Sequence, residues 1–230
     1  MKSSFKALAA IMIGLLGSTA QSVALAIPFT ESFDSNTANW KDVASIDLTH
    51  VGAGGPDGSG HVSTELPFTS APTGSSVLFR GHDAFNSSGD AFVGNWVAAG
   101  VQTLAAYVRH DAPEPVDFFA RVATPANFPG VIFSGPAPVQ PNTWTLLELQ
   151  IDPTSPLVTV EGPPGNFNAA LSHVGNVQIG ARVPPALAAD PTAYTFDLDA
   201  VSIAVPEPAC GLLILTAAVV GVLGRATHRR

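Results

Sequence analysis

The chain has very little cysteine and few basic residues. Its 230 residues include one cysteine, and ten Lys and Arg stand against 18 Asp and Glu, which gives a formal net charge of −8. A single cysteine, Cys210, cannot form a disulfide within the chain. It also lies in an apolar C-terminal segment, which excludes a cysteine nucleophile inside the main domain. The shortage of Lys and Arg argues against nucleic acid as a partner, because phosphates require clustered cations.

Sequence signatures of common hydrolases are also absent. The chain has neither a Gly-x-Ser-x-Gly elbow nor a His-Glu-x-x-His motif, so it lacks a recognisable serine nucleophile or zinc-hydrolase site. Five of the six histidines are scattered through residues 27–204, at positions 50, 61, 82, 110 and 173. We therefore predict a protein that is not an enzyme. A secreted glycoside hydrolase stays open as a third alternative, because such an enzyme needs only two suitably spaced carboxylates.

The N-terminus has the pattern of a signal peptide. Lys2 and Lys6 precede the apolar stretch Ala7–Leu16, and Ala24-Leu25-Ala26 supplies a cleavage site before Ile27. A second small-residue site, Ser18-Thr19-Ala20, would instead start the mature chain at Gln21. Residues 1–26 are thus predicted to direct export.

The last 26 residues combine a short motif, an apolar run and a basic end. The motif is Pro206-Glu207-Pro208, the uncharged run is Ala209–Gly224, and the end carries Arg225, His228, Arg229 and Arg230. Two prolines keep the motif extended, and the arginines favour a cytoplasmic end for an apolar helix in the inner membrane. The order resembles the PEP-CTERM sorting signal of bacteria that produce exopolysaccharide. The resemblance implies that residues 205–230 anchor the chain transiently and that an exosortase acts at the motif. The protein would then reach the cell surface or the extracellular matrix, in a biofilm setting.

Residues 27–204 between the two signals are predicted to form one all-β domain. Short β-type runs alternate with turns rich in Pro and Gly, which favours an antiparallel sandwich over a parallel sheet. In the final run, Phe196 and Leu198 share one phase whereas Val201 and Ile203 share the other, so we expect a bulge near Asp199. The predicted strands are Ser45–Val51, His61–Leu66, Ser76–Arg80, Thr103–His110, Val116–Thr124, Val131–Ser134, Thr143–Ile151, Leu157–Glu161, Val174–Ala181 and Tyr194–Ile203.

Several short segments of the domain carry a second resemblance. They are Phe29-Thr30-Glu31-Ser32-Phe33-Asp34 leading to Trp40, the loop ending in Pro56-Asp57-Gly58-Ser59-Gly60-His61-Val62, the strand start Asn142-Thr143-Trp144, and the closing stretch from Phe196 to Ile203. The domain is similar to laminin IV type A-like and carbohydrate-binding jelly rolls of the galactose-binding type. This resemblance implies a structural Ca²⁺ held by Glu31 and Asp199. Solvated surface acids are the alternative for both residues.

Sugar binding would require an exposed aromatic ring that can stack on a pyranose. Trp96 follows Gly94-Asn95 in a Gly- and Ala-rich stretch, so we expect its ring to be exposed. Trp144 shares its strand phase with Leu146, so we expect it to be buried. The leading expectation is a non-enzymatic surface or matrix protein, and the alternative is a carbohydrate-binding module that contacts polysaccharide.

Overall fold

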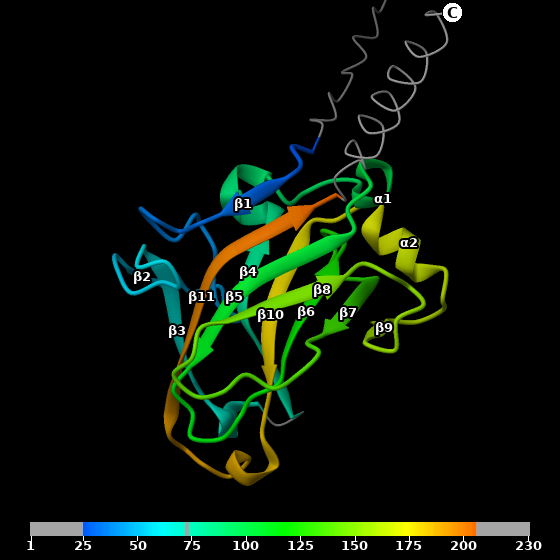
Figure 1. The fold of residues 1–230 in the computed structure, drawn as a ribbon. Coiled ribbons are helices and arrows are strands. Elements are labelled where there is room, and N and C mark those ends of the chain that lie inside the picture. The colour runs from blue at the N-terminus through cyan, green and yellow to red at the C-terminus, as the bar shows by residue number, and fades with distance from the viewer. Residues whose placement is uncertain (1–24, 72–73, 206–230) are drawn as a thin grey trace, which may run out of the picture.

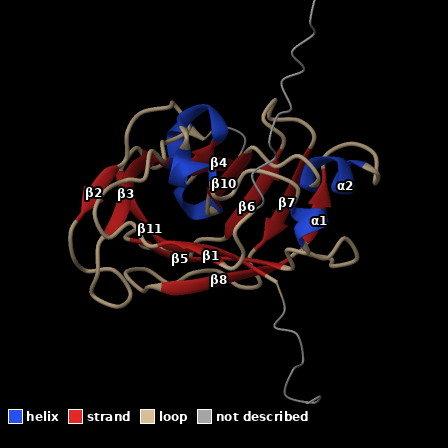
Figure 2. Ribbon diagram, turned by 90° about the horizontal axis from the view of Figure 1, so that it is seen from above, coloured by secondary structure: helices blue, strands red, loops and turns tan. Residues whose placement is uncertain are grey.

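Two antiparallel β-sheets pack face to face (Figures 1 and 2). The structure is a computed structural model and describes residues 25–71 and 74–205. Sheet A has the order β2-β3-β11-β5-β8, with β1 paired to β11, and sheet B has the order β4-β10-β6-β7-β9. Sheet A comprises β1 (Phe29–Glu31), β2 (Thr49–Val51), β3 (His61–Pro67), β5 (Thr103–His110), β8 (Thr145–Gln150) and β11 (Ala193–Ala204). Sheet B comprises β4 (Ser75–His82), β6 (Phe118–Ala123), β7 (Gly130–Ser134), β9 (Val158–Val160) and β10 (Asn176–Arg182).

The predicted antiparallel β-sandwich is therefore confirmed, and each of the ten predicted strands has a counterpart. Their ends differ: Ser45–Val51 contains only the three-residue β2, and Val116 lies before β6 in an isolated bridge to Val139. The sequence prediction missed β1. That segment has only three residues, and Phe29–Glu31 becomes a strand because β11 pairs with it.

Short helices complete the described part of the domain. They are α1 (Trp96–Ala99), α2 (Asn166–Leu171) and the 3₁₀ turns η1 (Phe68–Ser70), η2 (Asp83–Phe85), η3 (Ser87–Asp90) and η4 (Pro185–Leu187). Within residues 25–71 and 74–205, none of these helices has the length and apolar character needed to cross a membrane. The hydrophobic C-terminal helix predicted for residues 209–224 lies outside the described residues.

The alternation of side chains along the strands separates core from surface. On β5, Leu104, Ala106 and Val108 are buried between the sheets, whereas Tyr107 and Arg109 lie on the outer face of sheet A. This is the period of two expected when one face of a strand is covered. The outer face of sheet A is consequently built from the odd-numbered positions of β5 and their partners on β3 and β11.

A bulge interrupts β11 where the sequence predicted it. The register between β11 and β5 shifts between Asp199 and Ser202, and Ala200 has a φ of 47°. A bulge lets the strand change the face that its alternate residues present. Phe196 and Leu198 are therefore buried before it and Val201 and Ile203 after it, while Asp199 is turned toward the outer side.

Candidate functional site

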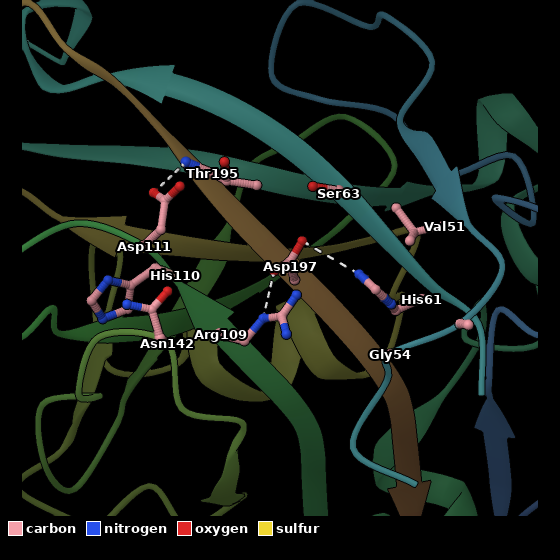
Figure 3. Close-up of a pocket in the computed structure, with 11 residues that line it drawn as sticks. Val51, Gly54, His61, Ser63, Arg109, His110, Asp111, Asn142, Thr195 and Asp197 are labelled. Atoms are coloured by element: carbon pink, nitrogen blue, oxygen red, sulfur yellow. Dashed lines mark hydrogen bonds and ion pairs between the residues drawn. The ribbon is translucent and has the colours of Figure 1, made fainter. Parts of the chain in front are cut away.

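The outer face of sheet A carries a cleft of about 440 Å³ (Figure 3). Its floor comes from β3, β11 and β5, and its rim comes from the loop after β2 and the loop before β8. The volume falls within the range of small-ligand sites. The lining residues are mostly polar: Val51, Ala53, Gly54, His61, Ser63, Arg109, His110, Asp111, Asn142, Thr195 and Asp197.

Asp197 stands at the centre of the cleft floor. The strand register places it directly between Ser63 on β3 and Arg109 on β5. Arg109 Nε donates a hydrogen bond of 2.8 Å to Asp197 Oδ2, and His61 Nε2 approaches Asp197 Oδ1 at 3.6 Å (Figure 3). Because the Asp197 side chain is only 6 % exposed, Arg109 supplies the charge that compensates a nearly buried carboxylate.

Trp144 lies beside this floor, in contact with three of the residues that line the cleft, Gly54, His61 and Arg109. Val108 pairs with Thr145 at the start of β8, so Trp144 comes next to Arg109 on the outer side. The Arg109 guanidinium lies 4.9 Å from the centre of the Trp144 ring, and the His61 ring meets it edge-on at 5.3 Å. A cation over a tryptophan face and an edge-on aromatic contact are both favourable. Trp144 is therefore held in place by two residues that line the cleft.

The glycine-rich loop between β2 and β3 folds over the same face. Trp144 Nε1 donates a hydrogen bond of 2.8 Å to the carbonyl oxygen of Gly54 in this loop. The next residue, Gly55, lies so close to the floor that a Cβ there would stand 2.8 Å from Asp199 Oδ2. Only glycine fits such an approach without a shift, so this glycine is required by packing.

The cleft keeps unused hydrogen-bonding groups. Among the described residues, the terminal nitrogens of Arg109 and the side chain of Asn142 form no hydrogen bond with protein. Two buried imidazole nitrogens, His61 Nδ1 and His110 Nδ1, also have no partner within that part of the chain. Buried polar atoms are normally satisfied, so these two nitrogens leave a place for a buried water, whereas the free groups of Arg109 and Asn142 are available to a polar ligand.

His61 is neutral near pH 7. Burial lowers the pKa of His61, nearby Arg109 and His50 lower it further, and Asp197 opposes them. The contact of 3.6 Å with Asp197 is also longer than a hydrogen bond. His61 is therefore a neutral imidazole and not the cation of an ion pair.

The cleft holds two carboxylates, and both accept hydrogen bonds from the protein. Arg109 binds Asp197, and the backbone N–H of Thr195 donates to Asp111 Oδ1 at 2.7 Å. Within the described residues, no group of three or more His, Cys, Asp and Glu side chains is close enough to hold a metal ion. The cleft thus offers donors and acceptors with an aromatic ring beside them, which suits a ligand rich in hydroxyl groups.

The prediction that the Trp96 ring is exposed was wrong. Its side chain is 1 % exposed, and its Nε1 donates to the carbonyl of Phe92 at 2.8 Å. Asn95 caps a helical turn there by accepting from the backbone N–H of Ala98, and α1 turns Trp96 into the core. It cannot serve as a stacking surface. The Gly and Ala residues near Trp96 indicate exposure in the sequence alone, but here they flank a side chain that is buried in the core.

The expected burial of Trp144 is also wrong. Leu146 is 46 % exposed, whereas Leu147 and Leu149 are buried, so β8 has the opposite phase to the predicted one. Adjacent leucines at 146 and 147 left that phase ambiguous in the sequence. Trp144, and not Trp96, is the aromatic residue beside the cleft. The pairing of β8 with β5, which brings Trp144 next to Arg109, could not be predicted from the sequence.

Glu31 and Asp199, the predicted calcium ligands, lie on neighbouring strands of sheet A. Glu31 pairs with Val201 across β1 and β11, and its Oε1 accepts from the N–H of Phe33. Asp199 is 1 % exposed. Burial, together with the nearby charges of Asp57 and Asp34, raises the pKa of Asp199 to about 6, although the N–H of Ala200 favours its charged form. The sorting motif, Pro206, Glu207 and Pro208, lies outside the described residues.

Comparisons with known proteins give a likeness in fold. No protein-family model and no curated protein matches the chain. An exo-β-agarase structure matches with 10 % identity and a TM-score of 0.50, covering 79 % of this chain and 26 % of that one. Two modules of a Clostridium thermocellum endo-1,4-β-D-xylanase, complexed with xylohexaose, match with 13 % identity and a TM-score of 0.47, covering 78 % and 28 %. The L4b domain of human laminin α-2 matches with 14 % identity and a TM-score of 0.45, covering 79 % and 99 %.

This chain spans about a quarter of the length of the first two of these structures. The match to the exo-β-agarase, with its TM-score of 0.50, agrees with the expected fold. A laminin domain and carbohydrate-binding modules are among the other neighbours, at TM-scores below 0.5. Identities of 10 to 14 % support the architecture alone, because one fold serves many functions.

Proposed function

We propose that this domain is a polysaccharide-binding module of an exported protein and that its ligand lies in the cleft on sheet A. The observation that carries the proposal is the arrangement of Arg109 between Asp197 and the ring of Trp144. A fixed guanidinium with free terminal nitrogens can donate to the hydroxyl groups of a sugar, and the tryptophan offers an apolar wall for its C–H groups. Several solved structures of similar fold are named as carbohydrate-binding modules, which agrees with this ligand class.

The charge of the domain favours a neutral polysaccharide. Five Lys and Arg stand against seventeen Asp and Glu between Ile27 and Val205. The single cation of the cleft, Arg109, is already compensated by Asp197, and Asp111 adds a further carboxylate. A chain of acidic sugars would be repelled by this field, whereas hydroxyl groups are not.

Titration of the domain against neutral polysaccharides tests the proposal. We expect binding to at least one of xylan, agarose and mixed-linkage β-glucan, and Trp144→Ala is expected to weaken it about ten-fold because it removes the aromatic wall. Leu146→Ala, two residues along the same strand, serves as the control and should bind as wild type does. Absence of binding to all three polymers contradicts the proposed function.

Binding without cleavage is part of the same proposal. A glycosidase needs one carboxyl group that stays protonated to act as general acid. In the cleft, Asp197 accepts a hydrogen bond from Arg109 and Asp111 accepts one from a backbone N–H, so each is held as an acceptor. Incubation with a bound polymer, followed by reducing-end analysis, should show no shortening. Shortening that disappears in Asp197→Asn would establish the hydrolase alternative.

Export and surface delivery form the second part of the proposal. The signal-peptide pattern of residues 1–26 and the PEP-CTERM-like residues 205–230 support an exosortase substrate that passes through the inner membrane. Replacing Pro206, Glu207 and Pro208 with alanine is expected to leave the chain uncleaved in the membrane fraction of its host. Normal release of this variant would contradict the sorting role.

We also propose calcium as a structural ion beside Asp199. Burial, and then the charges of Asp57 and Asp34, raise the pKa of Asp199, and a divalent cation beside Asp199 would offset this unfavourable burial of its charge. Asp199 and Glu31 would hold the ion together with backbone oxygens, and the ion would neutralise a buried negative charge. A melting temperature that is the same in calcium and in chelator would contradict this site.

A further inference from the structure

A bridge divides the outer face of sheet A into two parts. It consists of the Trp144 side chain and the loop at Gly54, joined by the hydrogen bond from Trp144 Nε1 to the Gly54 carbonyl oxygen. Gly54 follows β2 at one edge of the sheet, and Trp144 precedes β8 at the other edge. The two partners therefore meet above the middle strands β3, β11 and β5.

The space beneath the bridge is filled. Arg109 lies under the Trp144 ring at 4.9 Å, and the ring of His61 closes against its edge at 5.3 Å. On the loop side, Gly55 rests directly on the carboxylate of Asp199. A polymer chain cannot pass under the bridge, because side chains in van der Waals contact occupy that volume.

The cleft lies on one side of this bridge. Thr195, Asp111 and Asn142 line it at the far end from the bridge, whereas Gly54, His61 and Arg109 line it at the bridge itself (Figure 3). Asp199, two residues beyond Asp197 on β11, is under the loop and is not part of the lining. The bridge thus closes one end of the cleft.

We propose that the cleft binds the end of a polysaccharide chain and not an internal segment. The inference rests on the proposed function, and it adds which part of the polymer is recognised. An internal segment must enter and leave a binding site, which requires two open ends. A chain terminus needs one, and its additional terminal hydroxyl group can meet the terminal nitrogens of Arg109 at the bridge.

Stoichiometry measured by calorimetry tests this inference. The purified domain is titrated with xylohexaose and with size-fractionated xylan, and likewise with oligomers and polymers of agarose and mixed-linkage β-glucan. We expect the number of domains bound per chain to stay at about one whatever the chain length, because each chain offers one suitable end. A number that rises in proportion to length would overturn end recognition while leaving polysaccharide binding intact. No binding to any oligomer or polymer would instead contradict the proposed function itself.

The variant Trp144→Phe tests the bridge directly. Phenylalanine keeps an aromatic ring but cannot donate to Gly54, so the bridge should open and the number of domains per polymer chain should become length-dependent. Leu146→Ala is the matched control, since it changes the same strand outside the bridge. Both variants are checked for an unchanged melting temperature. A folded Trp144→Phe protein that still binds one domain per chain would show that the bridge does not block the cleft, and if this variant fails to fold the wild-type stoichiometry decides alone.

Discussion

Two arginines on opposite faces of the sandwich have opposite environments. On sheet B, Arg121 donates through Nε and Nη2 to Glu161 and through Nη1 and Nη2 to Asn127, while Gln178 accepts a further bond. On sheet A, the Arg109 side chain makes one hydrogen bond within the described residues, to Asp197, and its guanidinium carbon lies 4.9 Å from the centre of the Trp144 ring. The side chain of Arg121 is 12 % exposed and that of Arg109 is 32 % exposed.

This difference separates structural from available polar groups. A guanidinium whose donors are all used fixes its neighbours and has nothing left for a ligand. Arg121 ties the loop at Asn127 to β10 through Gln178 and to the strand end at Glu161. Arg109 compensates Asp197 but keeps donors that face the cleft. Burial and satisfaction of hydrogen bonds, more than residue type, therefore indicate which arginine belongs to the site.

The largest expected effect comes from removing Arg121. Arg121→Ala leaves Glu161 without its bidentate partner and strips a hydrogen bond from Gln178, so the free energy of unfolding should fall by about 3 kcal/mol. Polysaccharide binding should be unchanged, because the cleft lies on the other sheet. Urea unfolding and a parallel titration measure both. Arg182→Ala on the same face is the control, and it should cost about 0.5 kcal/mol or less. Comparable losses in the two variants would contradict the structural role of Arg121.

Asp199 extends the comparison of the two sheets. Unlike Glu161 and Asp197, which are paired with arginines, this buried carboxylate of sheet A has no cationic partner among the described residues. Its pKa in the fold is about 6, above the unfolded value of 3.8. Protonation of Asp199 therefore raises the free energy of unfolding. This gain is fully present below about pH 4 and is lost as the pH rises through about 6. Asp199→Asn should remove this pH dependence and stabilise the calcium-free protein at pH 8 by about 2 kcal/mol.

Thermal melts in chelator between pH 4 and pH 8 measure this effect for wild type and Asp199→Asn. The variant should also lose any gain in melting temperature on addition of calcium, because an amide is a weaker ligand for the ion than a carboxylate. An Asp199→Asn protein that is less stable than wild type at pH 8 in chelator would contradict the unfavourable burial of this charge.

Removing Arg109 should affect both stability and binding. Arg109→Ala leaves the nearly buried Asp197 without its partner, which should cost about 1 to 2 kcal/mol, less than for Arg121 because Arg109 is more exposed. Polysaccharide affinity should fall about ten-fold with the loss of the free donors. Arg109→Lys is the informative control: it should recover part of the stability but not the affinity, since an ammonium lacks the planar fork. Full recovery of affinity in Arg109→Lys would argue that charge alone matters.

Asn142 should show the smallest effect, confined to binding. Its side chain lines the cleft and makes no hydrogen bond within the described part of the chain. Asn142→Gly, in which glycine tolerates the φ of 56° at this position, should therefore weaken polysaccharide binding by about three-fold, the equivalent of one modest hydrogen bond, with no change in melting temperature. A drop of several degrees in melting temperature would instead assign Asn142 a structural role in the loop before β8.

Much of the architecture could be read from the sequence because strands leave a local pattern. A β-type run predicted β5 from Thr103 to His110 with the same ends as in the structure, and the change of phase near Asp199 predicted the bulge in β11. The pattern failed where both neighbouring positions were apolar. Leu146 and Leu147 left the phase of β8 undecided, and that error reversed the expected exposure of Trp144.

By itself, the sequence determined an acidic all-β domain between a signal-peptide pattern and a PEP-CTERM-like pattern. Composition and periodicity can be read from residues that are neighbours in the chain. The tertiary structure alone decided the site. Gly54, His61, Arg109, Trp144 and Asp197 are far apart in the chain, and the β3–β11–β5 pairing together with two loops brings them together. No local pattern encodes these contacts. Likewise Trp96 became a core residue because a helical turn rotated it inward, although its small neighbours had suggested exposure.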